Sequence, residues 1–306
     1  MTEALNGFLV IDKPAGLTSH DCISRIRQVC RLRRVGHGGT LDPAATGVLP
    51  VALGSATRLL PFLPGDKKYR GTIQLGLHTS SDDLQGEVLA CQDWPRNCNA
   101  TTIRQALMCF QGTIQQQPPQ ISAVHVDGER AYRRVHRGET VNLPYRSVTL
   151  HSLTLLNWDP SNGQVQLEIH CSAGTYIRSL ARDLGKLLGC GGCLAKLQRI
   201  QAAGFSLAQA VPLPNTSAAP PWPLPILDGL AHLPRLYLQE AEIKYWRHGR
   251  YLILHPSRLG CSLTSPNSNL PRAVAILNRD DHRALGVGLL SLDGLLRPRV
   301  VLDAIS

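Results

Sequence analysis

Apolar residues recur along this chain in short runs whose spacing predicts strands. Residues 7–13 (GFLVIDK) form a nearly continuous apolar run with the length of a buried strand. From Tyr69 onward, Ile73 and Leu75 fall on one face of an extended chain, while the polar residues between them fall on the other. The same alternation predicts two further strands, over residues 148–156 and 165–171.

Helical spacing of apolar residues predicts three helices. Thr18 and Asp21 match a capping box, and apolar residues follow them every three or four positions. Residues 101–110 form a second helical pattern, and a third pattern runs from Thr175 to Leu188. Because these helices are separated by strands without regular β-α-β alternation, the sequence predicts an α+β fold.

The last third of the chain changes character at a proline-rich segment. Residues 211–225 (VPLPNTSAAPPWPLP) contain six prolines, so we expect a connector without regular structure. From near Pro234, short apolar runs are separated by turn residues up to the end of the sequence. This pattern predicts a small β-rich module of about 70 residues.

The composition is that of an ordinary globular protein with an excess of positive charge. The 306 residues are 43% hydrophobic and 18% charged, and the formal net charge is +10. This charge indicates a polyanionic partner, which by itself leaves RNA, DNA and an anionic membrane surface open. No apolar stretch approaches the roughly 18 residues that span a bilayer, and the N-terminus lacks the pattern of a secretory signal. We therefore expect a cytoplasmic protein that does not span a membrane.

The nine cysteines are odd in number and scattered, and in a cytoplasmic protein we expect their thiols to be reduced. Only Cys190 and Cys193 form a C-x-x-C motif. A zinc site would need a second pair or nearby histidines, and a thioredoxin-like site would need a helix that begins at the motif. The motif instead follows a predicted helix, which favours a structural turn over a metal or redox role. We expect no bound metal.

The most informative segment is residues 35–50, VGHGGTLDPAATGVLP. Pro43 restricts the preceding Asp42 to extended backbone, and the surrounding glycines allow main chain to pass close to a ligand. Glycine, aspartate and proline are also ordinary turn residues. Spacing alone therefore leaves a surface turn and a catalytic loop about equally open.

This loop resembles the catalytic loop of the TruB family of tRNA pseudouridine synthases, written GH-x-G-x-LDP-x-ATG-x-LP. Four further segments match the family in its order: 7–21 (GFLVIDKPAGLTSHD), 66–76 (DKKYRGTIQLG), 116–132 (QQPPQISAVHVDGERAY) and 171–185 (CSAGTYIRSLARDLG). Together the five segments cover roughly residues 7–205, and their order makes coincidence a poor explanation.

The resemblance implies a pseudouridine synthase core with a mixed, mainly antiparallel sheet, flanking helices and an active cleft across the middle of the sheet. It implies a catalytic domain over residues 1–233 and a C-terminal PUA-like RNA-binding domain over residues 234–306. It also implies an RNA-binding thumb at about residues 115–141, where arginines alternate with an aromatic residue.

The activity implied is isomerisation of uridine-55 to pseudouridine in the T loop of tRNA. No cofactor is expected, because nothing is oxidised or donated and the sequence has no nucleotide-binding glycine motif. The implied partner is the tRNA T loop and stem, with no obligatory protein partner and a monomeric enzyme. A guide-RNA-dependent enzyme of the same class is a weaker alternative than this stand-alone enzyme. A non-catalytic tRNA-binding protein or folding chaperone is the alternative from another class. A plain DNA-binding module lacks any helix-turn-helix or zinc-finger pattern.

Three residues match the catalytic positions of the family. Asp42 would act as nucleophile or base beside the carbon that becomes electron-poor, as carboxylates do in glycosidases. Arg178 would stabilise the charge of this carboxylate, although an arginine on the polar side of an amphipathic helix is the alternative. Tyr69 would stack on the extruded uracil and present its hydroxyl near C5, although a core tyrosine at a strand start is the alternative.

A second group of residues matches positions that bind substrate. His37 would enter the target loop and displace or support flipped nucleotides, because chemistry on a stacked base requires its extrusion. Asp83 would order basic residues near the site, with a plain turn acid almost as well supported. The other expected substrate-binding residues are Lys13, Gly39, Thr40, Lys68, Arg134 of the thumb, and Arg199.

Overall fold

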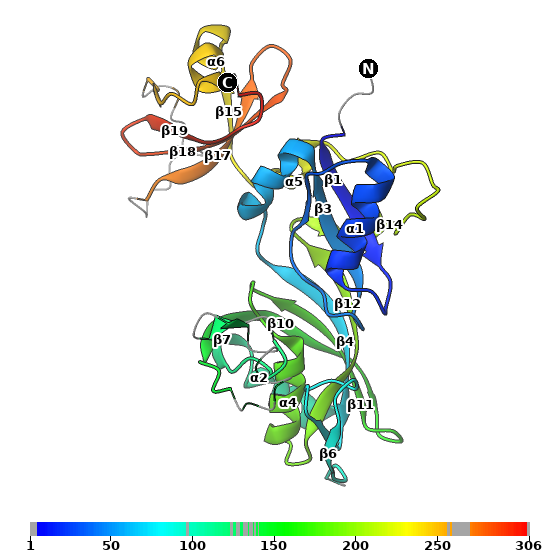
Figure 1. Cartoon of the computed structure of the whole chain (residues 1–306). Coiled ribbons are helices and arrows are strands. Elements are labelled where there is room, and N and C mark those ends of the chain that lie inside the picture. The colour runs from blue at the N-terminus through cyan, green and yellow to red at the C-terminus, as the bar shows by residue number, and fades with distance from the viewer. Residues whose placement is uncertain are drawn as a thin grey trace.

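A computed structural model describes residues 5–95, 98–122, 125, 126, 129, 130, 134, 137, 139, 141–255, 258 and 270–304. The described chain forms one large sheet, a smaller sheet near the C-terminus, and helices packed against both (Figure 1). None of its helices is long and apolar enough to cross a membrane.

The large sheet is mixed and mainly antiparallel, as predicted. In spatial order its strands are β14 (Val211–Pro212), β1 (Gly7–Lys13), β3 (Thr46–Leu53), β12 (Gly192–Ala202), β4 (Lys67–Leu75), β11 (Gln164–Cys171), β10 (Arg146–Asp159) and β7 (Gly112–Gln116). The short strands β2 (Val35–His37) and β13 (Phe205–Ser206) pair with β3 and β12. Only the β14–β1 and β3–β12 pairs are parallel.

The predicted alternation is present in β4. Tyr69, Ile73 and Leu75 are buried on one face, whereas Arg70 lies exposed on the other. The strand begins at Lys67, two residues before the predicted start. This register is what places Tyr69 on the helix-covered side of the sheet, among buried residues of the core.

Helices cover both ends of the sheet. The helix α1 (Ser19–Cys30) begins at the predicted capping box of Thr18 and Asp21 and packs on β1 and β3. The helices α2 (Ala100–Met108) and α4 (Ile177–Leu187) pack against the strands from β12 to β10 (Figure 1). The amphipathic stripe of α4 therefore fixes the position of its first turn, which carries Arg178.

The turn that contains the C-x-x-C motif lies directly against α4. A Cβ on Gly185 would come within 2.1 Å of the backbone of Gly191 and Gly192, so only glycine permits this approach. Cys190 and Cys193 are buried and unbridged, and burial raises the pKa of both thiols. The turn therefore serves to pack the chain closely against α4.

The proline-rich segment departs from its prediction at its start. Val211 and Pro212 form the two-residue strand β14, which pairs with β1 at the edge of the sheet. An edge strand tolerates proline because one side of its backbone has no partner to receive a hydrogen bond. Further along, Leu224 exchanges backbone hydrogen bonds of 2.7 and 3.0 Å with Phe8, so the connector is held along β1.

The C-terminal region is β-rich, as predicted. Its sheet has the order β15 (Arg235–Leu238), β17 (Arg272–Asn278), β18 (Ala284–Leu290), β19 (Leu295–Val301) and β16 (Leu252–Ile253). The helix α6 (Glu240–Arg247) was not predicted, although Gln239 and Glu242 form a capping box there. Its Trp246 is fully buried in the core of this region. Ala275 and other residues of the sheet also join a cluster with Phe8 of β1.

The remaining described elements are short. They are η1 (Gly54–Phe62), β5 (Leu77–Thr79), β6 (Val88–Cys91), β8 (His125–Val126), β9 (Glu129–Arg130), η2 (Leu207–Gln209) and α5 (Ile226–Gly229).

Candidate active site

The loop that carries Asp42 joins β2 to β3. Two buried side chains, Arg199 and Lys13, hold it through hydrogen bonds. Arg199 of β12 is fully buried and donates to the carbonyl oxygens of Gly39 (3.0 Å), Thr40 (3.2 Å) and Val48 (2.7 Å). Arginine suits this position because its rigid guanidinium presents several donors in one plane. Arg199 therefore fixes the loop before Asp42 and the strand after it.

Lys13 holds the other side of the same loop. Its ammonium is fully buried and donates to the carbonyl oxygens of Pro43 (3.1 Å), Pro14 (2.8 Å) and Leu17 (2.6 Å). Burial is the largest influence on the pKa of Lys13 and lowers it. Lys13 and Arg199 were expected to bind substrate, but in this structure their polar atoms hold the loop.

The backbone between these two contacts is also fixed. Ser19, at the first turn of α1, accepts from the Leu41 N–H at 2.9 Å and donates to the Leu41 carbonyl at 3.2 Å. The Gly16 N–H donates to the Pro43 carbonyl at 2.9 Å. Asp42 is thus a half-exposed residue of a loop whose backbone is tied down on both sides of it.

Replacing Lys13 with methionine is expected to lower the free energy of unfolding by about 3 kcal/mol, because three carbonyl oxygens lose a charged donor in a buried site. Urea denaturation measures this loss. The control is Lys186→Met on an exposed position of α4, which should stay within about 0.5 kcal/mol of the wild type. Equal stabilities for the two variants would contradict a loop-holding role for Lys13.

Arg178 pairs with Asp42, as predicted. Its Nη2 donates to Asp42 Oδ1 at 3.2 Å, and its Nε lies 3.0 Å from Asp42 Oδ2. The Nε atom has no aligned hydrogen-bond acceptor, so this second contact is ionic. The guanidinium side chain is only 7% exposed, whereas the Asp42 side chain is 43% exposed. The carboxylate therefore remains accessible to solvent, while the guanidinium paired with it is shielded from solvent.

Other polar groups fix the guanidinium of Arg178. Its Nη1 donates to the carbonyl oxygens of Ser81 (3.2 Å) and Ile121 (3.0 Å). Asp83 Oδ2 lies 3.7 Å from Nε, while Asp83 Oδ1 accepts from Ser81 Oγ at 2.5 Å. Asp83 thus orders a basic residue of the site and also stabilises its own turn, so both interpretations from the sequence apply.

Tyr69 lies beside these groups and is only 6% exposed. Burial raises its pKa to about 12, against the lowering effect of the nearby Arg199, with which Tyr69 shares a side-chain hydrogen bond. The side chain is therefore a neutral phenol at pH 7. It can stack and form hydrogen bonds, but a phenolate base is not available at that pH.

His37 ends β2 close to the loop. Burial lowers the pKa of His37, and the charges of Arg199 and His20 lower it further. The Gly39 N–H donates to His37 Nδ1 at 3.3 Å, which leaves the proton of the neutral ring on Nε2. The imidazole can thus offer one N–H donor to a nucleotide.

The lowered pKa of His37 gives a pH prediction. Because the folded-state pKa lies below 6.5, the contribution of His37 to stability is complete above that pH and is lost as the pH falls through the folded value. A nitrogen-detected NMR titration should find His37 as the Nε2–H tautomer with a pKa below 6.5. A His37 pKa at or above 6.5 would contradict this environment.

The two remaining predicted residues, Lys68 and Arg134, are not among the described residues that contact the Asp42–Arg178 pair. Lys68 occupies the face of β4 opposite Tyr69, because neighbouring residues of a strand alternate. Arg134 forms an ion pair with Glu139 at 2.7 Å. Most of the thumb, including Tyr132 and Arg133, lies outside the described residues. The structure therefore brings together nine of the eleven predicted site residues: Asp42, Tyr69, Arg178, His37, Lys13, Gly39, Thr40, Asp83 and Arg199.

Sequence reasoning missed two residues at the start of the helix that carries Arg178. Tyr176 precedes α4 and lies under Arg146, whose guanidinium carbon is 5.8 Å from the ring centre. The fully buried Gln116 accepts from the Tyr176 N–H at 2.8 Å and donates to its carbonyl at 3.1 Å. An available signal was the position of Tyr176 two residues before Arg178, which places it at the start of the same helix.

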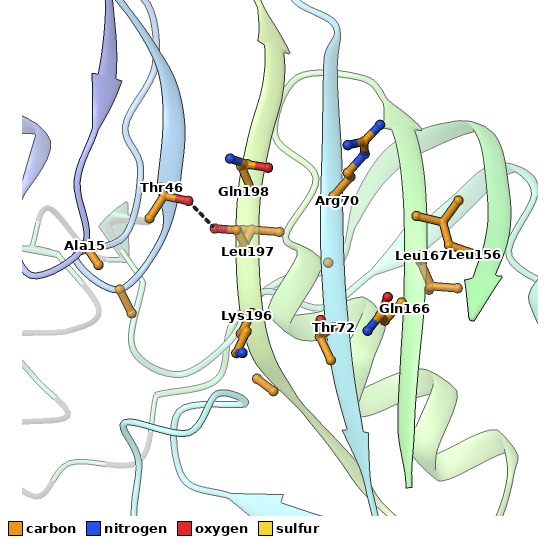
Figure 2. Close-up of a pocket in the computed structure, with 13 residues that line it drawn as sticks. Ala15, Thr46, Arg70, Thr72, Leu156, Gln166, Leu167, Lys196, Leu197 and Gln198 are labelled. Carbon is orange, nitrogen blue, oxygen red and sulfur yellow. Dashed lines mark hydrogen bonds between the residues drawn. The ribbon is translucent and has the colours of Figure 1, made fainter. Parts of the chain in front are cut away.

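A shallow pocket of about 430 Å³ lies across β12, β4 and β11 (Figure 2). Its lining includes Arg70, Lys196 and Gln198, together with Ala44 and Thr46 from the segment after Asp42. Asp42 and Tyr69 do not line it. The pocket therefore lies on the face of β4 that carries Arg70, and its lining does not include the Asp42–Arg178 pair.

The fold is that of chains solved in H/ACA ribonucleoprotein complexes. The chain aligns with the one in the archaeal box H/ACA Nop10–Cbf5 complex with a TM-score of 0.68 and 22% identity, covering 99% of this chain and 88% of that one. It aligns with a chain in an H/ACA particle bound to substrate RNA with a TM-score of 0.69 and 22% identity, covering 96% and 84%. At these identities the likeness concerns the fold alone.

Sequence comparison defines the family. Residues 27–177 match the model of the TruB family pseudouridylate synthase N-terminal domain. A protein of Parasynechococcus marenigrum named tRNA pseudouridine synthase B is 59% identical, covering 97% of this chain and 98% of its own length. A protein of the same name from Synechococcus elongatus is 48% identical, covering 98% and 99%. The chain belongs to the TruB family of pseudouridine synthases.

Proposed function

We propose that this protein isomerises uridine-55 to pseudouridine in the T loop of tRNA. The observation that carries the proposal is the half-exposed Asp42 carboxylate, held by the buried guanidinium of Arg178 beside the neutral phenol of Tyr69. The net charge of +10 supports tRNA as the partner. A protein that only binds RNA has no use for an aligned carboxylate, because a carboxylate repels phosphate.

The reaction breaks the N1–C1′ bond of uridine, turns the base, and joins C5 to C1′. The C5 proton is released and N1 gains a proton, so the product has the composition of the substrate. No electrons are transferred to an acceptor. Every step can therefore be served by a carboxylate, an aromatic support and bound water.

Asp42 meets the electron-poor sugar that forms as the base departs. In one route its carboxylate attacks a carbon of the nucleotide, and in the other it accepts a proton from the sugar. Both routes need a carboxylate held in one orientation. The contacts of Asp42 with Arg178, and the hydrogen bonds of Lys13 and Arg199 to the loop, provide this orientation.

Tyr69 supports the extruded base. Its ring lies in the buried layer next to the site, where it can stack on uracil, and its neutral hydroxyl can form a hydrogen bond there.

The other expected residues divide into two groups. His37, Gly39 and Thr40 border the loop at its exposed side and would contact nucleotides, with the T loop opened by base flipping. Lys68 and Arg134 would contact phosphates further out. Lys13, Asp83 and Arg199 act through the groups they hold.

The proposal extends to the organisation of the chain. Residues 1–233 would form the catalytic domain, with the thumb at about 115–141, and residues 234–306 a PUA-like RNA-binding domain. The C-terminal sheet with its own buried core supports this division. The enzyme would act in the cytoplasm as a monomer, without a guide RNA or protein partner.

Mapping of the modified position tests the substrate assignment. Unmodified tRNA transcript is incubated with the protein, and carbodiimide adducts of pseudouridine are located by primer extension. We expect one new stop, immediately 3′ of position 55, and none in a transcript with cytidine at position 55. Modification of a different uridine would overturn the proposed target, and no modification would overturn the proposed activity.

A further inference from the structure

Three side chains with metal-binding atoms converge at the beginning of β4. Asp66 immediately precedes this strand, His170 lies on β11, and His151 lies at an irregularity of β10. His151 Nε2 is 3.3 Å from Asp66 Oδ2, and the two imidazole rings are 4.6 Å apart between their centres. One donor atom from each residue lies within 4.8 Å of the others.

The spacing of these atoms is close to what a tetrahedral metal ion requires, and one of the distances already matches it. Zinc binds imidazole nitrogen and carboxylate oxygen at about 2.0–2.2 Å, which places neighbouring donors about 3.4 Å apart. The His151–Asp66 separation already has this length, and His170 needs only a small side-chain adjustment. Two imidazoles and one carboxylate also form a donor set that suits zinc and similar divalent ions.

We propose that Asp66, His151 and His170 bind one divalent transition-metal ion of the zinc type, with an open fourth position for water. The three ligands come from separate chain segments, so the ion would tie the beginning of β4 to β10 and β11. Asp66 lies three residues before Tyr69. The metal therefore stabilises the strand end that positions the active-site tyrosine.

One neighbouring charge opposes the ion and one supports it. Lys68 is the cross-strand partner of His170, so its ammonium lies on the same face and repels a cation. The Asp66 carboxylate offsets that charge. Because both Asp66 and His151 are exposed, the ligands can adjust around the ion at little cost, and binding is moderate rather than irreversible.

Cobalt(II) titration of the untagged full-length protein tests the site, since the absorption of bound cobalt reports its ligands. Cys91 and Cys109, which are exposed, and Cys261, which lies outside the described residues, are first replaced by serine to remove competing thiols. We expect one equivalent to bind, with a tetrahedral or five-coordinate spectrum and no thiolate charge-transfer band. We also expect the melting temperature to rise in excess metal.

Variants of each ligand make the test specific. His170→Ala, His151→Ala and Asp66→Asn should each weaken binding at least about tenfold, since even second-shell changes have effects of this size. Asp66→Asn keeps the shape of the side chain, so it guards against a folding defect. His78→Ala, at an exposed histidine of β5, is the matched control and should bind as before.

Three results would overturn the proposal. They are the absence of one-equivalent binding, binding that survives all three ligand variants, and a thiolate band in the parent protein. The first would leave the 3.3 Å His151–Asp66 contact as an ordinary surface ion pair. None of these outcomes bears on uridine isomerisation.

Discussion

Asp42→Asn is expected to abolish pseudouridine formation while changing the affinity for tRNA by less than about tenfold. An amide can neither attack carbon nor accept a proton at neutral pH, so both routes open to Asp42 fail. The amide is nearly the same size, and the loop is held by Lys13, Ser19 and Arg199 rather than by Asp42 itself. Filter binding gives the affinity, and nucleoside chromatography gives the product.

The control for this prediction is Asp12→Asn. Asp12 is an exposed carboxylate on β1, next to Lys13 in the sequence, and it has no role in the proposed chemistry. The Asp12→Asn variant should retain nearly full activity. Turnover by Asp42→Asn at a sizeable fraction of the wild-type rate would remove Asp42 from the mechanism.

Arg178→Lys is expected to lower kcat by about 100-fold or more and to leave the KM for tRNA little changed. Arg178 contacts both oxygens of Asp42 and the carbonyls of Ser81 and Ile121 at once, which a single ammonium cannot reproduce. The Asp42 carboxylate is then no longer held in one orientation. A displacement of a reacting group by about 1 Å can lower the rate about 100-fold. Steady-state kinetics on tRNA transcript separates the two parameters.

Arg182→Lys provides the matched control for Arg178. Arg182 lies one turn further along α4 and pairs with Asp82 and Asp183, away from Asp42. Its replacement should affect stability more than kcat. If Arg178→Lys instead raised KM and left kcat intact, Arg178 would be a substrate-binding residue rather than one that positions the carboxylate.

Local patterns in the sequence predicted the elements that depend on neighbouring residues. The first strand occupies its predicted range at Gly7–Lys13, and the capping box of Thr18 and Asp21 begins α1 as expected. The strand β14 was missed because pairing with β1 overrides the low strand propensity of proline at a sheet edge. The helix α6 was missed because its few apolar residues resemble the short runs of the surrounding strands.

The site could be predicted only where a motif joined distant residues. Asp42 and Arg178 are 136 positions apart, so no spacing rule connects them, and their pairing was expected from the family resemblance. Nothing local indicates that Lys13 and Arg199 are buried, because charged residues are normally exposed. Their role depends on carbonyl groups that converge only after the sheet has formed.

Tritium release from C5-labelled uridine in unmodified tRNA transcript tests the central claim most directly. The wild type and Asp42→Asn are each mixed with transcript at equal concentration, so that slow turnover does not hide the chemistry. The account predicts release by the wild type alone, with tRNA bound by both proteins. Release by both would contradict the assignment of Asp42, and release by neither, with tRNA still bound, would contradict the assignment of the reaction.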